Sequence, residues 1–231
     1  MPDSTIYSEN SGNSDDAVLF NYTTTDWATT RGNSSTSGNA RRADDSSYTT
    51  SIFSRFLSGR GGDTWFNRRV YMGFDVSGES GTVDSATVKV VMDNIGDTGN
   101  YARVVMVGAT ALAGSTADYG NCFTDTSSPP TLGALYAPVV EVSTAIGEHA
   151  FVLNSSGISA LNTQIGSGIF EVCFMSHRLD YSNEDPNDGS GDYTQIAVTF
   201  AETSGTSFDP KIEIDYEAIV THNATFFGAN F

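Results

Sequence analysis

Short segments in which apolar and polar side chains alternate recur along this chain, and they limit its fold more than any other feature. In the segment 211–216, two isoleucines and a tyrosine alternate with a lysine, a glutamate and an aspartate. The segment 69–76 places Val70, Met72 and Phe74 on one face and Tyr71 on the other. Successive side chains of a β-strand point to opposite faces, so this period predicts half-buried strands.

Further strands are expected where apolar runs lie between turn residues. The run 169–175 is apolar on both faces apart from Glu171, which is typical of a central strand that is covered on both sides. Other predicted strands lie at 87–92, 101–107, 138–142 and 193–200.

One short helix is predicted among these strands. Ser155 and Ser156 are residue types that cap a helix, and Gly166 and Gly168 are residues that end one. The apolar residues between them fall on one helical stripe, namely Ile158, Leu161 and Ile165.

The composition agrees with a fold built from strands. The chain has 23 glycines among 231 residues and only two lysines, Lys89 and Lys211, although helix surfaces usually need lysine. About eight to ten short strands separated by turns favour an all-β sandwich of two stacked antiparallel sheets. A chain of this length is ordinary for one such sandwich.

Three regions are predicted along the chain. Residues 1–47 are polar apart from a short apolar run at 17–20, which indicates an extended N-terminal arm or edge strand with long loops. Residues 48–217 form the sandwich. Residues 218–231 form a tail with three phenylalanines near its end, and exposed apolar side chains cost about 2 kcal/mol each. The tail is therefore expected to dock, either on its own sandwich or on a neighbour.

Charge is spread unevenly over the chain. The net charge is −17, which argues against nucleic acid as a partner. Residues 1–70 contain seven arginines and eight acids, whereas residues 71–231 carry a net charge of −16. The arginines either sit in solvated loops with local ion pairs or meet the acidic surface of a neighbouring protein. Candidate assembly residues are Arg31, Arg41, Arg42, Arg55, Phe226, Phe227 and Phe231.

The cysteines and the N-terminal segment bear on the cellular compartment. Cys122 and Cys173 are the only cysteines; a disulfide between them is possible, but a buried free thiol is favoured at Cys173, which lies in an apolar run. The first residues lack the charged and apolar regions of a signal peptide, and no stretch has membrane-spanning length. We therefore expect a protein made in the cytoplasm, with no membrane partner.

An acidic loop is the one candidate metal site. Oxygen-bearing side chains at this density are the ligands that calcium selects, although the spacing departs from that of an EF-hand loop. The alternative is a solvated acidic turn. The candidate calcium ligands are Asp180, Asn183, Asp185, Asp188 and Asp192.

Two tryptophans are the candidates for a sugar-binding platform. Trp27 and Trp65 could stack on sugar rings, although a role in the core or at an interface is the alternative. The sequence has no nucleophile elbow, phosphate-binding loop or zinc motif, and nothing marks two of its many acids as a catalytic pair. We therefore expect neither an enzyme nor a required cofactor.

The order of the predicted elements resembles a known family. The matching parts are the strand 70–75, the segment 82–90, the helix with the strand 168–174, and the closing strand 209–216. Together they resemble the jelly-roll sandwiches of the disaggregatase-related and carbohydrate-binding-module-like kind, over roughly residues 65–218. Similar domains occur on secreted bacterial polysaccharide-active proteins and on the surface of tailed-phage virions, and the stretch 177–186 looks more like the phage branch.

This resemblance implies a jelly-roll order of strands and a non-enzymatic role at a virion surface. The expected function is that of a capsid decoration or cement protein, which binds and stabilises the assembled particle as a dimer or trimer. Its expected partners are other copies of itself and virion proteins such as the major capsid protein. The alternative function is a carbohydrate-binding module or a receptor-binding tail or fibre lectin.

Overall fold

The computed structural model of this chain is dominated by antiparallel β-strands. It describes residues 2–8, 16–32, 41–42, 49–60, 62–97, 102–110, 116–125, 130–142, 144–187, 192–200 and 207–218. The strands are β1 (Ser4–Tyr7), β2 (Ala17–Thr23), β3 (Arg41–Arg42), β4 (Thr49–Leu57), β5 (Thr64–Asp75), β6 (Val83–Asp97), β7 (Arg103–Gly108), β8 (Val140–Glu141), β9 (Gly147–Val152), β10 (Ile169–Ser176), β11 (Tyr193–Thr199) and β12 (Lys211–Tyr216). The helices are α1 (Trp27–Gly32) and α2 (Ser155–Gln164), with a 3-10 turn at Thr116–Gly120 and a π-helical turn at His177–Tyr181.

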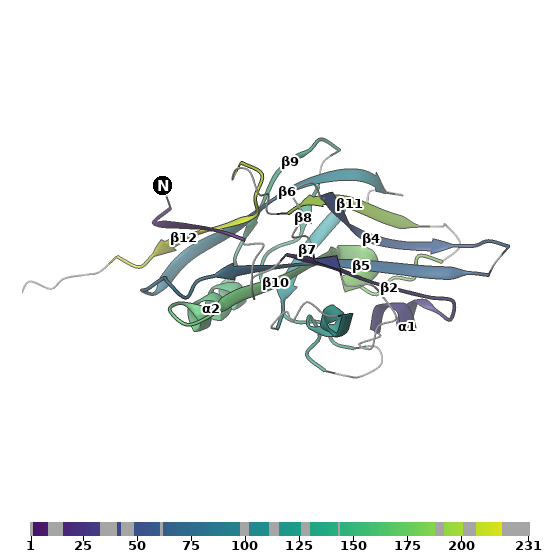
Figure 1. The fold of residues 1–231 in the computed structure, drawn as a ribbon, viewed down its shortest axis with the longest axis horizontal. Helices are drawn as coiled ribbons and strands as arrows, with labels where there is room; N and C mark the ends of the chain where they lie inside the picture. The colour runs from purple at the N-terminus through teal and green to yellow at the C-terminus, as the bar shows by residue number, and fades with distance from the viewer. Residues whose placement is uncertain are drawn as a thin grey trace, which may run out of the picture.

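The strands stack in two layers (Figure 1), which confirms the all-β sandwich. One layer contains β1, β12, β6, β9 and β11, and the other contains β2, β5, β10, β7 and β8. The two expected sheets are joined, because β4 pairs with β11 of the first layer and with β5 of the second. The described strands therefore form one continuous sheet that folds over itself. The jelly-roll order of strands stays a prediction.

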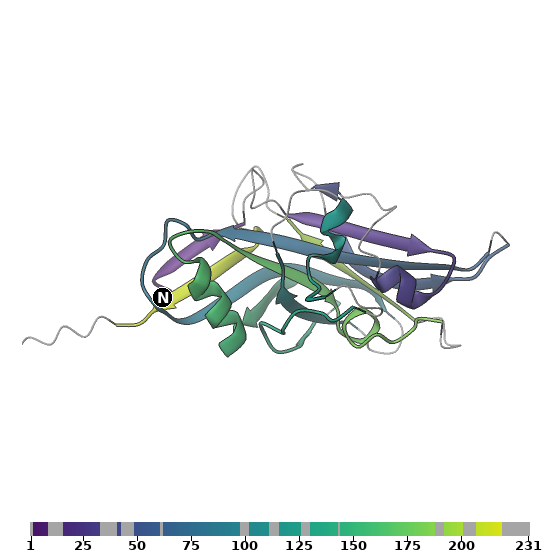
Figure 2. The ribbon, with the colours of Figure 1, turned by 90° about the horizontal axis from the view of Figure 1, so that it is seen from below.

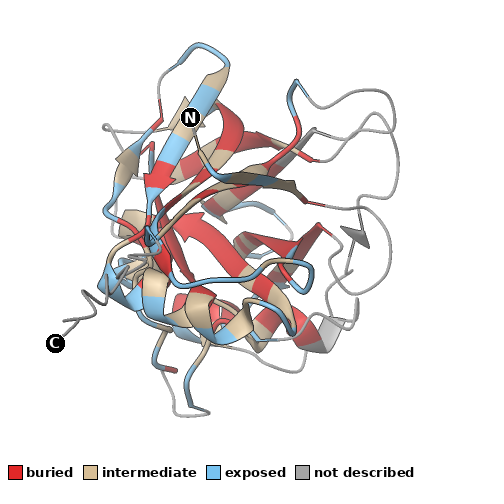
Figure 3. Ribbon diagram, turned by 90° about the vertical axis from the view of Figure 1, so that its left-hand side faces the viewer, coloured by how far each residue is buried: buried red, intermediate tan, exposed pale blue. Residues whose placement is uncertain are grey.

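The main core lies between the two layers (Figure 3). Val70, Met72 and Phe74 of β5 contribute to it from one layer and are fully buried. Ile212 and Ile214 contribute from the other layer, as their alternation with charged residues predicted. Burying a side chain of this size contributes about 1.5–3 kcal/mol, so this alternation fixes which face of each strand turns inward.

The second face of β5 is also buried, which the sequence did not indicate. Tyr71 was predicted to lie on a solvent-facing side, yet none of its surface is exposed. It packs with Tyr119, Cys122 and Cys173 in a second apolar cluster outside the main core. The long connection between β7 and β8 supplies Tyr119 and Cys122, so that connection acts as a third layer over the sandwich. Helix α1 lies on this side, against β2 and β5, whereas α2 packs against β6 and β10 beside the main core (Figure 2).

Helix α2 forms where it was predicted, but with a different cap. The side chain of Asn154 accepts hydrogen bonds from the backbone of Ser156 and Gly157, so the cap is Asn154 and not Ser155 or Ser156. Leu161 is fully buried in the main core. Gly166 follows the helix with a φ of 76°, a left-handed conformation that favours glycine and ends the helix as expected.

The predicted N-terminal arm is partly built into the sandwich. Strand β1 pairs with β12, and β2 pairs with β5 over seven positions. Ala17 and Leu19 of β2 are buried in the second cluster. Strands β1 and β2 therefore belong to the sheet, and the apolar run near residue 17 covers the edge of β5. No helix within the described ranges is long and apolar enough to span a membrane.

The cap of α2 gives a direct stability test. Replacing Asn154 with alanine leaves two backbone N–H groups without their acceptor, and we expect it to lower the free energy of unfolding by about 1–2 kcal/mol. The matched change Ser155→Ala should alter it by less than about 0.5 kcal/mol. Urea unfolding of both variants measures the difference, and a larger loss for Ser155→Ala would contradict the assignment of Asn154.

Candidate functional site

A row of exposed and half-buried aromatic and arginine side chains lies where β2, β4 and β5 run side by side. Arg68 of β5 is opposite Phe20 of β2 and Phe53 of β4, and Phe66 is opposite Tyr22 and Arg55. Residues directly opposite each other in a sheet present their side chains on the same face. We call these six side chains the arginine–aromatic surface; they are Phe20, Tyr22, Phe53, Arg55, Phe66 and Arg68.

The aromatic rings of this surface pack against one another and against a cation. Tyr22 and Phe66 are stacked with ring centroids 5.8 Å apart, and Phe53 meets Phe66 edge-on at 6.4 Å. The guanidinium carbon of Arg68 lies 5.4 Å from the ring centroid of Phe20 and 5.3 Å from that of Phe53. Cation–π contacts of this kind hold a charged side chain in place. Arg68 is therefore a positioned charge between two rings.

The surface is a continuation of the core. Phe66 and Arg68 share a face of β5 with Val70, Met72 and Phe74, which are fully buried between the layers. Beyond Arg68 the same face emerges from the sandwich, along the β4–β5 hairpin that extends to one end of the molecule (Figure 1). Tyr22 is 46% exposed there, Arg55 is exposed, and the other members are half-buried. An apolar sheet face thus meets solvent.

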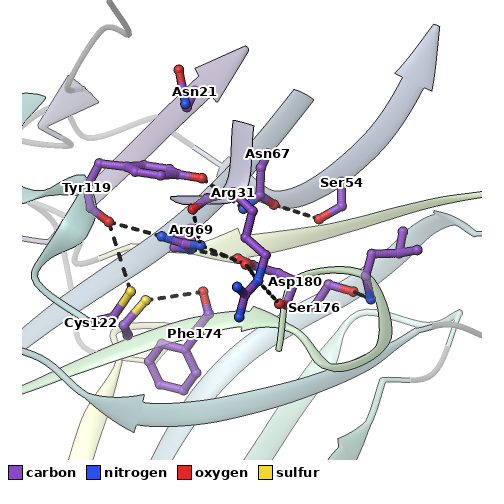
Figure 4. Close-up of polar contacts among 12 residues, drawn as sticks. Asn21, Arg31, Ser54, Asn67, Arg69, Tyr119, Cys122, Phe174, Ser176 and Asp180 are labelled. Carbon is purple, nitrogen blue, oxygen red and sulfur yellow. Dashed lines mark hydrogen bonds and ion pairs between the residues drawn. The ribbon is translucent and has the colours of Figure 1, made fainter. Parts of the chain in front are cut away.

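The opposite face of β5 carries a buried ion pair. Arg69 is fully buried and binds Asp180 of the π-helical turn through two hydrogen bonds of 2.7 Å, from Nε and from Nη2 (Figure 4). Its Nη1 also donates to the carbonyl of Tyr119 at 3.1 Å, and Nη2 donates to the carbonyl of Arg31 at 3.0 Å. Four hydrogen bonds compensate for removing this charge from water.

A second arginine shares the same carboxylate. The Nε of Arg31 donates to the backbone carbonyl of Asp180 at 2.5 Å and lies 3.5 Å from its side-chain oxygen. Burial lowers the pKa of Arg31, while the carboxylate of Asp180 opposes this effect. Burial also acts to lower the pKa of Arg69, but the charge of Asp180 outweighs it and holds that pKa well above its usual range. Arg69 therefore stays charged inside the protein.

Tyr119 connects the ion pair to its surroundings. Its carbonyl accepts from Arg69 and from the hydroxyl of Tyr71, the latter at 2.8 Å. Its own hydroxyl accepts from Asn67 at 2.9 Å and lies 3.2 Å from the carbonyl of Thr30. Burial raises the pKa of Tyr119, so its ring stays neutral. The network joins α1, β5, the 3-10 turn and the π-helical turn, and it is structural in character.

The predicted calcium ligands do not converge. The carboxylate of Asp180 is bound to Arg69, so its assignment as a calcium ligand is wrong. Asp185 accepts from the indole of Trp65 and from the backbone of Asn187, both at 2.9 Å, and Asp192 lies 3.6 Å from Arg178. Asn183 bends the chain with a φ of 59°. Asp188 lies outside the described residues, and the described part of the chain contains no group of acids, histidines and cysteines that could hold a metal.

The predicted tryptophan platform is wrong. Trp27 and Trp65 are only 3% and 8% exposed, and both pack with Leu179 in a third apolar cluster. Phe56 adds a further ring, 4.9 Å from that of Trp65. Their faces are covered by other side chains, so the alternative role in a core is confirmed. The rings of the arginine–aromatic surface, in contrast, reach solvent to different degrees.

The predicted assembly residues lie in different environments, and some of them lie outside the described residues. Arg31 is 4% exposed and bound to Asp180, so it does not lie at a surface that a neighbour could contact. Arg55 is exposed on the arginine–aromatic surface, and its role in assembly stays a prediction. Arg41 and Arg42 form β3, and only their backbone is described. The tail residues Phe226, Phe227 and Phe231 lie outside the described residues.

Most residues of the arginine–aromatic surface were not identified from the sequence, and neither were the contacts of Arg69. The signal for the exposed surface was present, because Phe66 and Arg68 continue the period-two pattern of β5. The partners of Arg69 gave no such signal, since Asp180 and Tyr119 are 111 and 50 residues away. Only the folded chain brings them into contact.

The buried pair predicts a large and specific loss of stability. Asp180→Asn removes the charge that compensates two buried guanidinium groups, and we expect it to lower the free energy of unfolding by about 3–5 kcal/mol. The matched change Glu141→Gln removes an exposed partner of Arg103 and should cost less than about 1 kcal/mol. Urea unfolding followed by tryptophan fluorescence compares them, and equal losses would show that the buried pair has no special role.

No protein-family model matches this chain, and a search of the curated proteins found no relative. We therefore base the functional proposal on the residues of this chain alone.

Proposed function

We propose that this chain is a non-enzymatic structural protein of a virion surface, of the capsid decoration or cement kind, and that it assembles through the arginine–aromatic surface. The observation that carries the proposal is a partly exposed sheet face with four aromatic rings and two arginines at one end of the molecule. Aromatic residues and arginine are enriched at protein interfaces and dominate their binding energy. The phage-like stretch of the sequence supports the virion setting.

The physical properties of this surface fit binding to a protein. Its rings are already packed together, and Arg68 is held between Phe20 and Phe53. Little side-chain freedom is lost when a partner covers such a preorganised surface, so more of the burial energy remains as affinity. Covering one exposed aromatic side chain contributes on the order of 2 kcal/mol.

The partner that the charges favour is a second copy of this chain. Arg55 is an exposed cation on this surface, whereas residues 71–231 carry a net charge of −16. A twofold contact centred on this surface would place it against itself and bring the two copies of Arg55 together. A head-to-tail contact instead places it against an acidic region of the next copy, and such contacts form a ring when the rotation between copies closes. We therefore favour a ring, such as a trimer, over a twofold dimer.

Carbohydrate binding is the second candidate function. Tyr22 is the most exposed ring of the surface and stacks on Phe66 at an interplanar angle of 27°. A broad aromatic face of this kind also stacks on sugar rings. This reading predicts binding of a glycan by the isolated protein, and it does not require the arginines to meet an acidic protein surface.

The assembly proposal is tested by the mass of the protein in solution. Light scattering after size exclusion should give a mass above that of the 24.6 kDa monomer. Arg68→Glu and Tyr22→Ser should each weaken association at least tenfold, because a tenfold change needs only about 1.4 kcal/mol of the lost contact. The matched changes Arg103→Glu and Phe208→Ser alter exposed residues elsewhere and should leave the mass unchanged.

Two further measurements separate the candidates. Circular dichroism should show that all four variants keep the β-rich fold. A monomer at every concentration, together with glycan-array binding that Tyr22→Ser removes, would replace the assembly proposal with carbohydrate binding. The virion setting is tested by mass spectrometry of particles purified from cells that make this chain, in which the chain should be an abundant component.

A further inference from the structure

The chain's two cysteines meet in the second apolar cluster. Cys173 is fully buried on β10, and Cys122, which is 1% exposed, follows the 3-10 turn at Thr116–Gly120. The Cys122 thiol points to the carbonyl of Tyr119 and the Cys173 thiol to that of Phe174, and the two side chains are close enough to affect each other's pKa. Both thiols are free in this structure.

The backbone holds each cysteine at this position. Cys173 is paired with Tyr71 of β5 on one side and with Val107 of β7 on the other. The carbonyl of Cys122 accepts from the backbone of Gly133 at 2.8 Å, and its sulfur lies 4.0 Å from the carbonyl of Tyr119 (Figure 4). The meeting of the thiols therefore follows from the fold and not from a chance rotation of one side chain.

We propose that Cys122 and Cys173 are a redox modification site, which forms an intrachain disulfide when the protein meets a disulfide oxidant such as oxidised glutathione. The bond would attach the outer connection between β7 and β8 to the central strand β10. This inference concerns the fold and does not depend on the proposed function.

The chemistry of the step balances without a cofactor. The thiolate of Cys122 attacks one sulfur of oxidised glutathione, which forms a mixed disulfide and releases one glutathione thiolate. Cys173 then loses its proton and attacks the sulfur of Cys122, which releases the second glutathione. The protein loses two protons and two electrons, which together equal two hydrogen atoms, and one oxidised glutathione becomes two reduced molecules.

The surroundings favour Cys122 as the attacking residue. Burial raises its pKa, but the neighbouring Cys173 side chain, the charge of Arg69 and the neighbouring Tyr71 side chain outweigh this and lower the pKa to about 7. Burial and the neighbouring Cys122 side chain raise the pKa of Cys173 well above its usual range. The first attack therefore belongs to Cys122, and Cys173 resolves the mixed disulfide.

The oxidant reaches these buried thiols only when the outer connection opens or while the chain folds. Oxidation of the folded protein is therefore expected to be slow, and oxidation during refolding to be fast. Once formed, the bond closes a long loop and restricts the unfolded chain. We expect the oxidised protein to unfold at a temperature roughly 5–15 °C higher than the reduced protein.

The experiment uses the wild-type chain, so it does not depend on a variant that folds. Protein is unfolded, reduced, refolded with or without oxidised glutathione, denatured again and treated with N-ethylmaleimide. The oxidised sample should carry no maleimide and have a mass lower by two hydrogen atoms than the reduced, unlabelled chain. Peptide mapping should find the peptide with Cys122 joined to the peptide with Cys173 in the monomer.

Two single variants serve as controls. Cys122→Ala and Cys173→Ala should each show no change of melting temperature with oxidant. Full maleimide labelling of both cysteines in the refolded wild type would overturn the proposal. So would a stable glutathione adduct on one cysteine, or disulfides formed only between chains, because either result would show that the two thiols do not meet.

Discussion

The bidentate contact between Arg69 and Asp180 is the interaction on which the outer part of this molecule depends. It fixes the π-helical turn against β5, and the remaining hydrogen bonds of Arg69 hold the carbonyls of Tyr119 and Arg31. A buried charge without a partner costs several kcal/mol, so the segments that supply these oxygens are tied to the sheet as one unit. The second apolar cluster lies beneath the layer that this unit holds in place, with Cys122 in that layer and Cys173 on β10 below it.

Strand β5 shows how one alternating sequence produces three environments. Val70, Met72 and Phe74 face the main core, and Arg69 and Tyr71 face the buried outer layer. Phe66 and Arg68 continue the core-facing pattern after the covering layer has ended. The same alternation that places apolar and aromatic side chains in the core therefore also places them at the surface, where they can bind a partner. Whether such a side chain is buried or exposed depends on whether another layer covers that part of the strand.

The alternation of charged residues on β12 was predicted from the sequence, but the ion pairs that these residues form were not. Lys211 and Glu213 were expected to point outward, and they do so on β12. The fold places Lys211 directly opposite Lys89, the other lysine of the chain. Glu148 and Glu213 separate the two like charges, with contacts of 3.0 Å from Lys211 to Glu148 and 2.9 Å from Lys89 to Glu213. No local pattern indicates such a network, because its members come from three strands.

The sequence by itself determined the β class, most strand positions, the single longer helix and the inward face of strands such as β12. Each of these follows from side-chain period and turn residues, which act over a few neighbouring positions. The tertiary structure alone decided that Trp27, Trp65 and Arg31 are buried, that Asp180 binds arginine and not a cation, and that Cys122 meets Cys173. Burial and pairing depend on which distant segment lies over a residue, and that is settled only when the layers pack.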